Sequence, residues 1–267
     1  MANRVAIAIG AHPDDIEFNM AGTLLLLKQA GHEIHYLTVA SGNCGGAEYD
    51  GPTLSTIRNA EARGAARILG ARFHPCFKND LEIFYDLETL RRLAGIIREV
   101  KPAVVLTHSP QDYMEDHTNT CRLAVTAAFA RGMPNFKTIP ARAIANHDTA
   151  VYHAMPHSLR DPLRRRIIPG AFVNTASVHK AKHAALAAHT SQQKWLDMSQ
   201  GLNCYLLAME DMSLAMGRMS RKFKHAEGWR RHLHFGFNAT DADPLREALG
   251  KDYLVNKTYE RNLEKGL

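Results

Sequence analysis

The sequence predicts an α/β protein in which a mostly parallel sheet is flanked by helices. Three observations support this class. Short apolar segments typical of buried strands alternate with longer segments typical of amphipathic helices, polar or glycine-rich loops follow the strands, and this order recurs through the first half of the chain. Crossovers between parallel strands are right-handed, so the carboxyl ends of these strands are expected to meet at one edge of the sheet.

The predicted elements alternate regularly up to about residue 130. Each strand is a short apolar run, and each helix has apolar residues that recur three and four positions apart. The strands are expected at Val5–Ile9, Glu33–Ser41 and Ala103–Ser109, and the helices at Ala21–Ala30, Ser55–Gly70, Leu87–Val100 and Asp116–Ala130.

The second half of the chain is less regular. Thr149–Ser158 is expected to be a strand that leads into a histidine-containing turn, and Val178–Leu196 is expected to be one helix. The basic, histidine-rich C-terminal region shows no clear periodicity. We therefore expect a single domain over residues 1–267, with a less regular C-terminal portion from about 196 to 267.

Composition argues against several classes of protein. Apolar residues make up 45% of the chain, yet no run approaches the roughly 18 residues of a membrane span, and the N-terminus lacks a signal-peptide pattern. The four widely spaced cysteines indicate neither a disulfide framework nor a cysteine zinc site, which fits a reducing cytoplasm. The net charge is +6, but the basic residues are scattered without interleaved aromatics, so no nucleic-acid partner is expected.

Side chains that bind metals follow the first and third predicted strands. His12 and Asp15 are three residues apart in a loop that enters a helix, so both can face one point. A third ligand must then come from a neighbouring loop, where "HSPQDYMEDHTNT" offers His108, Asp112, Asp116 and His117. His117, at the start of the next helix, is the natural choice. The sequence therefore predicts a metal site at the edge of the sheet.

Asp14 lies beside the candidate ligands without being needed as one. A carboxylate in this place suits a general base that takes a proton from metal-bound water. The alternative is that Asp14 only caps the helix that begins near Ile16.

Four segments together resemble the PIG-L/LmbE-like deacetylases. They are "AHPDDIE" (11–17), "RNAEARGAARILG" (58–70), "VVLTHSPQDYMEDHTNT" (104–120) and "HKAKHAALAAHTSQ" (179–192), in the order typical of that family. The family includes deacetylases of mycothiol and bacillithiol biosynthesis and of N-acetylglucosaminyl-phosphatidylinositol. The resemblance covers most of residues 1–195, and "AEGWRRHLHFGF" (226–237) resembles the family's later segment only loosely.

The resemblance implies a Rossmann-like sheet (the LmbE-like fold) and hydrolysis of an N-acetyl group from an N-acetylglucosamine-type amino-sugar conjugate. It implies a Zn²⁺ ion held by His12, Asp15 and His117, with Asp14 as the general base. Relatives are often homo-oligomers, which is the only ground for expecting one here. The further residues expected around the substrate are Glu17, Arg58, Asp112, Tyr113 and Met114.

One position departs from the family pattern. The family reads D-x-H-P-D-H in the third loop, whereas this chain reads "DYMEDH", with Met114 in place of the first histidine. A thioether cannot donate a charge-assisted hydrogen bond to an oxyanion. The candidate replacement donors are Tyr113, His108, His153, His157 and His189. His189 is ranked first because it matches a histidine usual in the family, and it is expected to be catalytic.

Alternative functions remain open at this stage. The Met114 departure makes an amidase that acts on a thiol conjugate or another small amide more credible. A non-catalytic relative that binds metal or sugar is a separate alternative. A nucleotide-binding protein is disfavoured, because the first strand–helix turn lacks G-x-G-x-x-G and carries acids that would repel a pyrophosphate. Two imidazoles and a carboxylate also accept Fe²⁺ or Co²⁺ as well as Zn²⁺.

Overall fold

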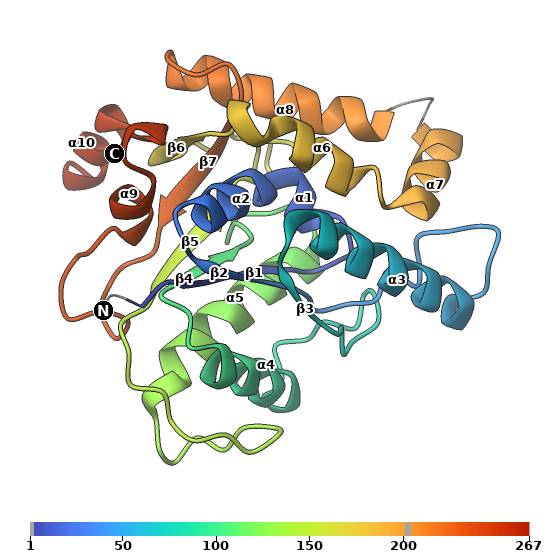
Figure 1. The fold of residues 1–267 in the computed structure, drawn as a ribbon, viewed down its shortest axis with the longest axis horizontal. Coiled ribbons are helices and arrows are strands. Elements are labelled where there is room, and N and C mark those ends of the chain that lie inside the picture. Colours follow the sequence, from blue (N-terminus) through green and yellow to red (C-terminus); the bar gives the residue numbers. More distant parts are fainter. Residues whose placement is uncertain (1–2, 201–203, 267) are drawn as a thin grey trace.

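The computed structural model describes residues 3–200 and 204–266 and contains one eight-stranded sheet covered by helices (Figure 1). The order of the strands in the sheet is β3-β2-β1-β4-β5-β7-β6-β8. Their bounds are β1 Val5–Gly10, β2 Glu33–Thr38, β3 Arg72–His74, β4 Val104–Thr107, β5 Ala150–Ala154, β6 Ala171–Asn174, β7 Ala226–Arg231 and β8 Tyr253–Val255.

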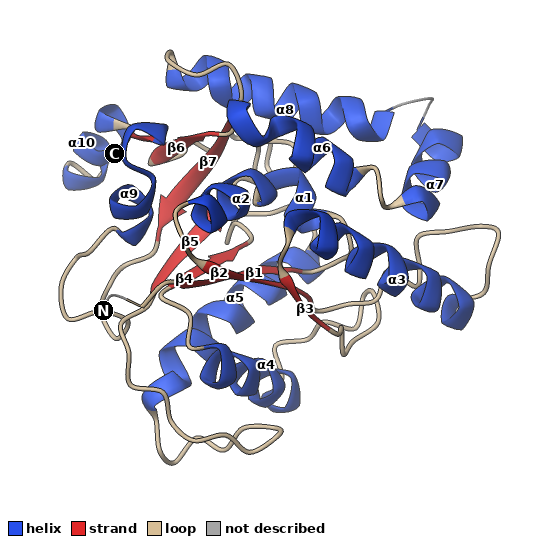
Figure 2. Cartoon of the chain, in the orientation of Figure 1, coloured by secondary structure: helices blue, strands red, loops and turns tan. Residues whose placement is uncertain are grey.

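Helices cover both faces of the central strands (Figure 2). Among those described, α1, α2, α3 and α6 lie on one face, and α4 and α5 lie on the other. The bounds are α1 Asp15–Asn19, α2 Ala21–Gln29, α3 Gly51–Leu69, α4 Leu87–Val100, α5 Glu115–Phe129, α6 His179–Leu186, α7 Thr190–Gln200, α8 Cys204–Ser220, α9 Pro244–Leu249 and α10 Lys257–Glu264.

The predicted fold class is confirmed. The strands from β3 to β5 pair in parallel, and β7, β6 and β8 extend the sheet in antiparallel pairs. Alternate residues of β1 point to opposite faces, so Ala6 and Ala8 pack in one core while Ile7 and Ile9 pack in the other. A strand buried on both faces reads as a continuous apolar run, which explains why β1 and β4 were visible in the sequence.

Several predicted boundaries needed correction. The second strand ends at Thr38 rather than Ser41, and only an isolated bridge between Ala40 and Lys78 continues it. Val178–Leu196 forms two helices, α6 and α7, instead of one. The chain breaks there because the Thr190 and Ser191 hydroxyls and the Ser191 amide donate to the Glu61 carboxylate, which caps a new helix start.

A buried carboxylate on β7 joins this strand to α6 through an ion pair and to α2 through hydrogen bonds. The Glu227 carboxylate accepts hydrogen bonds from the Gly22 and Thr23 amides at 2.8 and 2.7 Å and from Lys182 Nζ at 2.7 Å. The Trp229 indole donates to Thr23 Oγ1. A carboxylate at a helix N-terminus is stabilised by the free amides there. The loosely matched segment after residue 225 therefore has a structural role.

We expect Glu227→Gln to lower the free energy of unfolding by about 3–5 kcal/mol, because Lys182, whose side chain is 1% exposed, loses the carboxylate that neutralises it. Urea unfolding followed by circular dichroism measures this loss. Glu88→Gln is the matched control: it breaks an exposed pair with Arg92 and should change stability by at most about 0.5 kcal/mol. A loss below about 1 kcal/mol for the Glu227 variant would contradict a dominant role for this pair.

Candidate metal centre and active-site cleft

The loops that follow β1, β2 and β4 open onto one cleft of about 530 Å³. The rest of its wall comes from α1, α3, α7 and α8, from Asp80 and Leu81 after β3, and from His157, which follows β5. The cleft lies beyond the carboxyl ends of the parallel strands, where open α/β sheets bind ligands. The three loops that the sequence predicted to share an edge therefore do so.

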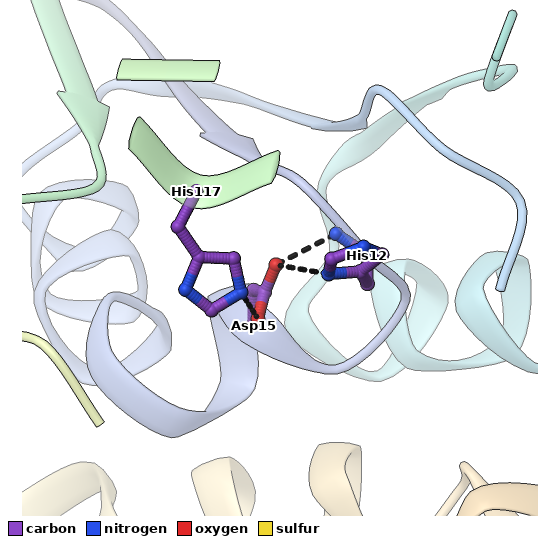
Figure 3. Close-up of side chains that lie close together, drawn as sticks. All are labelled: His12, Asp15 and His117. Atoms are coloured by element: carbon purple, nitrogen blue, oxygen red, sulfur yellow. Dashed lines mark hydrogen bonds and ion pairs between the residues drawn. The ribbon is translucent and has the colours of Figure 1, made fainter. Parts of the chain in front are cut away.

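His12, Asp15 and His117 converge in this cleft. One potential ligand atom from each lies within 4.8 Å of the others. Asp15 lies between the two imidazoles (Figure 3), with Oδ1 3.3 Å from His117 Nε2 and Oδ2 3.6 Å from His12 Nδ1. The loop after β1 and the first turns of α1 and α5 thus present two nitrogens and one carboxylate to a single point.

A second carboxylate holds the far nitrogen of each imidazole. Asp116 Oδ2 lies 2.8 Å from His12 Nε2, and Asp112 Oδ1 lies 3.1 Å from His117 Nδ1. Carboxylate–histidine pairs of this kind orient metal-binding imidazoles and increase their basicity. This arrangement fits a divalent metal ion, because each histidine keeps one nitrogen free to face Asp15.

The charges around the two histidines also fit a site for a divalent metal ion. Burial lowers the pKa of both histidines, but hydrogen bonding and attraction to the carboxylates outweigh burial and raise the pKa of His12 to about 9 and that of His117 to about 10. The cluster of acids thus stabilises positive charge at this point. A divalent ion would take over that role from the two protons.

His108 belongs to the same cluster but is less suited to be a ligand. Its Nε2 accepts a hydrogen bond from the Ala11 amide at 2.9 Å, and its ring stacks on that of His117 with centroids 4.1 Å apart. The Nε2 lone pair is therefore already used by the backbone. His108 supports the position of His117 from one side.

Asp14 is held beside the candidate ligands in a conformation that few residues adopt. Its φ is 109°, outside the usual range for residues other than glycine, and its side chain makes no helix-capping hydrogen bond. Instead, Tyr205 donates its hydroxyl proton to Asp14 Oδ2 at 3.0 Å, and Arg58 Nη2 lies 3.9 Å from the same oxygen. The capping alternative is therefore wrong for this side chain.

The environment of Asp14 also changes its acidity. Burial raises the pKa of Asp14 to about 6, although the nearby Arg58 guanidinium works in the opposite direction. A carboxyl group with a pKa close to neutral can both accept and return a proton during one reaction cycle.

The other residues predicted from the sequence fall into two groups. Arg58, Asp112, Tyr113 and Met114 line the cleft. Glu17 and His189 do not: both are fully buried behind it, with His189 Nε2 3.3 Å from Glu17 Oε1. Glu17 thus has the supporting position that the resemblance implied, whereas His189, which was expected to be catalytic, does not face the cleft.

Some of the side chains expected to replace the missing histidine donor line the cleft, and others do not. His157 and Tyr113 line the cleft near the ligands, as does His108. His153 is buried elsewhere and bonds through Nδ1 to the His108 carbonyl. The ring of His157 packs edge-on against Phe18 with centroids 5.1 Å apart.

Tyr205 is the main residue that the sequence did not indicate. It comes from the first turn of α8, in a region without recognisable periodicity, and is 1% exposed. Its contact with Asp14 joins residues 191 positions apart in the chain.

Comparison with known proteins gives these features a context. Residues 7–129 match the family described as GlcNAc-PI de-N-acetylase (PIG-L). The diacetylchitobiose deacetylase of Thermococcus kodakarensis is 28% identical over 193 residues, which is 70% of this chain and 69% of that protein. The 4-oxalmesaconate hydratase of Pseudomonas putida is 29% identical over 196 residues, or 70% of this chain and 74% of that protein.

The fold is shared with a solved structure as well. The N,N'-diacetylchitobiose deacetylase of Pyrococcus horikoshii, solved with an inhibitor, superposes with a TM-score of 0.73 at 22% identity. The superposition covers 91% of this chain and 88% of that one. Within the described residues, no helix is long and apolar enough to cross a membrane.

Proposed function

We propose that this chain is a metal-dependent hydrolase that removes the N-acetyl group from an N-acetylglucosamine-type amino-sugar conjugate. The match of residues 7–129 to the PIG-L family model and the 28% identity to a diacetylchitobiose deacetylase support this proposal. One observation carries this proposal: His12, Asp15 and His117 converge in a cleft directly beside the buried Asp14. Two imidazoles and one carboxylate form a catalytic metal site of a known kind when a fourth position stays open.

A bound divalent ion supplies positive charge that polarises the acetyl carbonyl and lowers the pKa of adjacent water toward about 7. Asp14 takes a proton from the water molecule as it attacks the acetyl carbon. The same carboxyl group then returns the proton to the amine nitrogen as the C–N bond breaks. The Tyr205 hydroxyl orients Asp14 by donating a hydrogen bond to it, and the Arg58 guanidinium stabilises the negative charge of the Asp14 carboxylate.

Negative charge develops on the acetyl oxygen during this attack and needs a donor. Met114 cannot supply one. We assign this task to His157, because it lines the cleft, while burial lowers its pKa and keeps the ring neutral with one N–H to donate. Tyr113, which is 53% exposed at the rim, is better placed to contact the sugar.

Three narrower points belong to the same proposal. Zn²⁺ is the expected metal, although Fe²⁺ and Co²⁺ suit the same ligands. The absence of a disulfide framework fits a cytoplasmic enzyme. A homo-oligomer is expected because relatives of this family are often homo-oligomers.

The test is acetate release from N-acetylglucosamine, diacetylchitobiose and an N-acetylglucosaminyl malate, measured on metal-free protein before and after adding Zn²⁺, Fe²⁺ or Co²⁺. We expect release only with added metal, and loss of release on addition of a chelator. Metal-independent release would contradict the proposed chemistry. Metal binding without release from any substrate would favour the amidase or non-catalytic alternatives.

The similarity to a hydratase supports a second candidate function. Met114 stands where the deacetylases use a histidine donor, so this chain departs from them at a catalytic position. In a hydratase, the same metal and Asp14 would deliver water to an electron-poor C=C bond of an unsaturated carboxylate, and the proton would go to carbon instead of nitrogen. Loss of ultraviolet absorbance of 4-oxalmesaconate, without acetate release from the sugars, would favour this candidate.

A further inference from the structure

A second cluster of potential metal ligands lies outside the cleft. It consists of His179, the first residue of α6, Glu210 in α8, and His225, which immediately precedes β7. One potential ligand atom from each of the three lies within 4.8 Å of the others. None of these residues lines the cleft described above. We call this group the distal cluster.

The two imidazoles of the distal cluster face one carboxylate. His179 Nε2 lies 2.5 Å from Glu210 Oε2, and His225 Nδ1 lies 3.6 Å from Glu210 Oε1. The two rings stack with centroids 4.0 Å apart. Each carboxylate oxygen therefore has one histidine nitrogen beside it.

Two buried nitrogens of the cluster lack a hydrogen bond. His179 Nδ1 and His225 Nδ1 are buried and have no hydrogen-bond partner. Burying a polar atom without a partner costs free energy, and a metal ion is one way to satisfy a nitrogen lone pair. The Glu210 side chain is 34% exposed, so an ion can reach the cluster from solvent.

The charge state favours coordination. Burial lowers the pKa of His225, and the neighbouring His179, Lys224 and Lys182 lower it further, whereas Glu210 raises it. These shifts favour the neutral form of the His225 ring, which is the form that can bind a metal. Lys182 is itself paired with Glu227, which reduces its repulsion of an added cation.

We propose that the distal cluster binds one divalent transition-metal ion, of the Zn²⁺ or Co²⁺ class, through His179, Glu210 and His225. Two imidazoles and one carboxylate are a ligand set of this class, with solvent at the remaining position. The ion would tie α6, α8 and the start of β7 together.

This site would have a structural consequence for the cleft. Glu210 is five residues beyond Tyr205 in α8, about 7.5 Å along the helix. An ion at the distal cluster fixes the part of α8 that follows the Asp14 contact. We therefore expect the distal ion to stabilise the helix that carries Tyr205, without touching substrate.

The experiment counts bound Zn²⁺ by equilibrium dialysis and elemental analysis of metal-free protein. The wild type should bind two ions per chain, and His117→Ala, which removes a ligand in the cleft, should bind one. His179→Gln, Glu210→Ala and His225→Asn should each bind one instead of two. His183→Gln changes a histidine of the same helix outside the cluster and should still bind two.

Two further measurements distinguish the loss of an ion from the loss of the fold. Circular dichroism checks the fold of each variant, and His179→Gln changes a partly exposed residue that should fold even if His225→Asn does not. In the His117→Ala background, Zn²⁺ should raise the melting temperature, and the additional His179→Gln change should abolish that rise. A wild-type chain that binds no more ions than each of the three cluster variants would overturn the proposal, whereas a single ion that is lost in those variants and kept in His117→Ala would count against the cleft site instead.

Discussion

Asp14→Asn is expected to lower the turnover number for acetate release by about 10²–10⁴-fold while the protein still binds its metal. The amide has the same shape as the carboxylate but cannot accept a proton from water. Asparagine also tolerates positive φ better than most residues, so the unusual backbone at φ 109° should be kept. The measurement is steady-state release of acetate with saturating metal, together with the amount of metal bound.

Two further variants show whether a loss of activity comes from proton transfer. Glu115→Gln changes an exposed acid in the first turn of α5 and should leave the turnover number near the wild-type value. Tyr205→Phe removes the hydrogen bond to Asp14 and should give an intermediate loss, of about tenfold. Wild-type turnover in Asp14→Asn would rule out Asp14 as the base and direct attention to another group in the cleft.

The elements that could be predicted share one physical feature: the apolar residues that each one buries recur at regular spacing within its own segment. Leu87–Val100 was predicted with both ends correct, because one face is consistently apolar and Asp86 caps the start by accepting from the Thr89 amide. The strand Val5–Gly10 was visible because both of its faces are buried. Each of these elements is specified by residues within its own segment.

The elements that escaped prediction depend on distant partners. The segment of β7, "AEGWRR", has little strand character, and it is held in the sheet partly because Glu227 binds α2 and Lys182. The break between α6 and α7 depends on Glu61, which lies in a different helix. No periodicity within the segments themselves contains this information.

The candidate site shows the same division. His12 and Asp15 are neighbours in sequence, and His117 follows a strand that pairs with β1, so topology alone brings them to one edge. Tyr205 reaches Asp14 from a helix 191 residues later, and the inward burial of His189 depends on how α6 packs. The convergence of side chains placed by the sheet was predictable, whereas the positions of residues placed by helix packing were not.

His117→Ala is expected to remove the metal from the cleft and reduce acetate release to the level of the metal-free protein. With only His12 and Asp15 left, the ion loses one of three protein ligands, and the carboxylate of Asp112 loses the imidazole that it positions. The readouts are zinc affinity by competition with a chelator and acetate release across a range of metal concentrations.

Asp112→Asn separates loss of metal from loss of chemistry. It keeps all three ligands but removes the charge behind His117, so metal affinity should fall by about 10–100-fold while excess metal restores most of the activity. Excess metal should not rescue Asp14→Asn, because that variant lacks the proton acceptor and keeps the ion. If excess metal fails to rescue Asp112→Asn, Asp112 does more than orient His117, and its position on the cleft wall would make direct contact with substrate the next hypothesis to test.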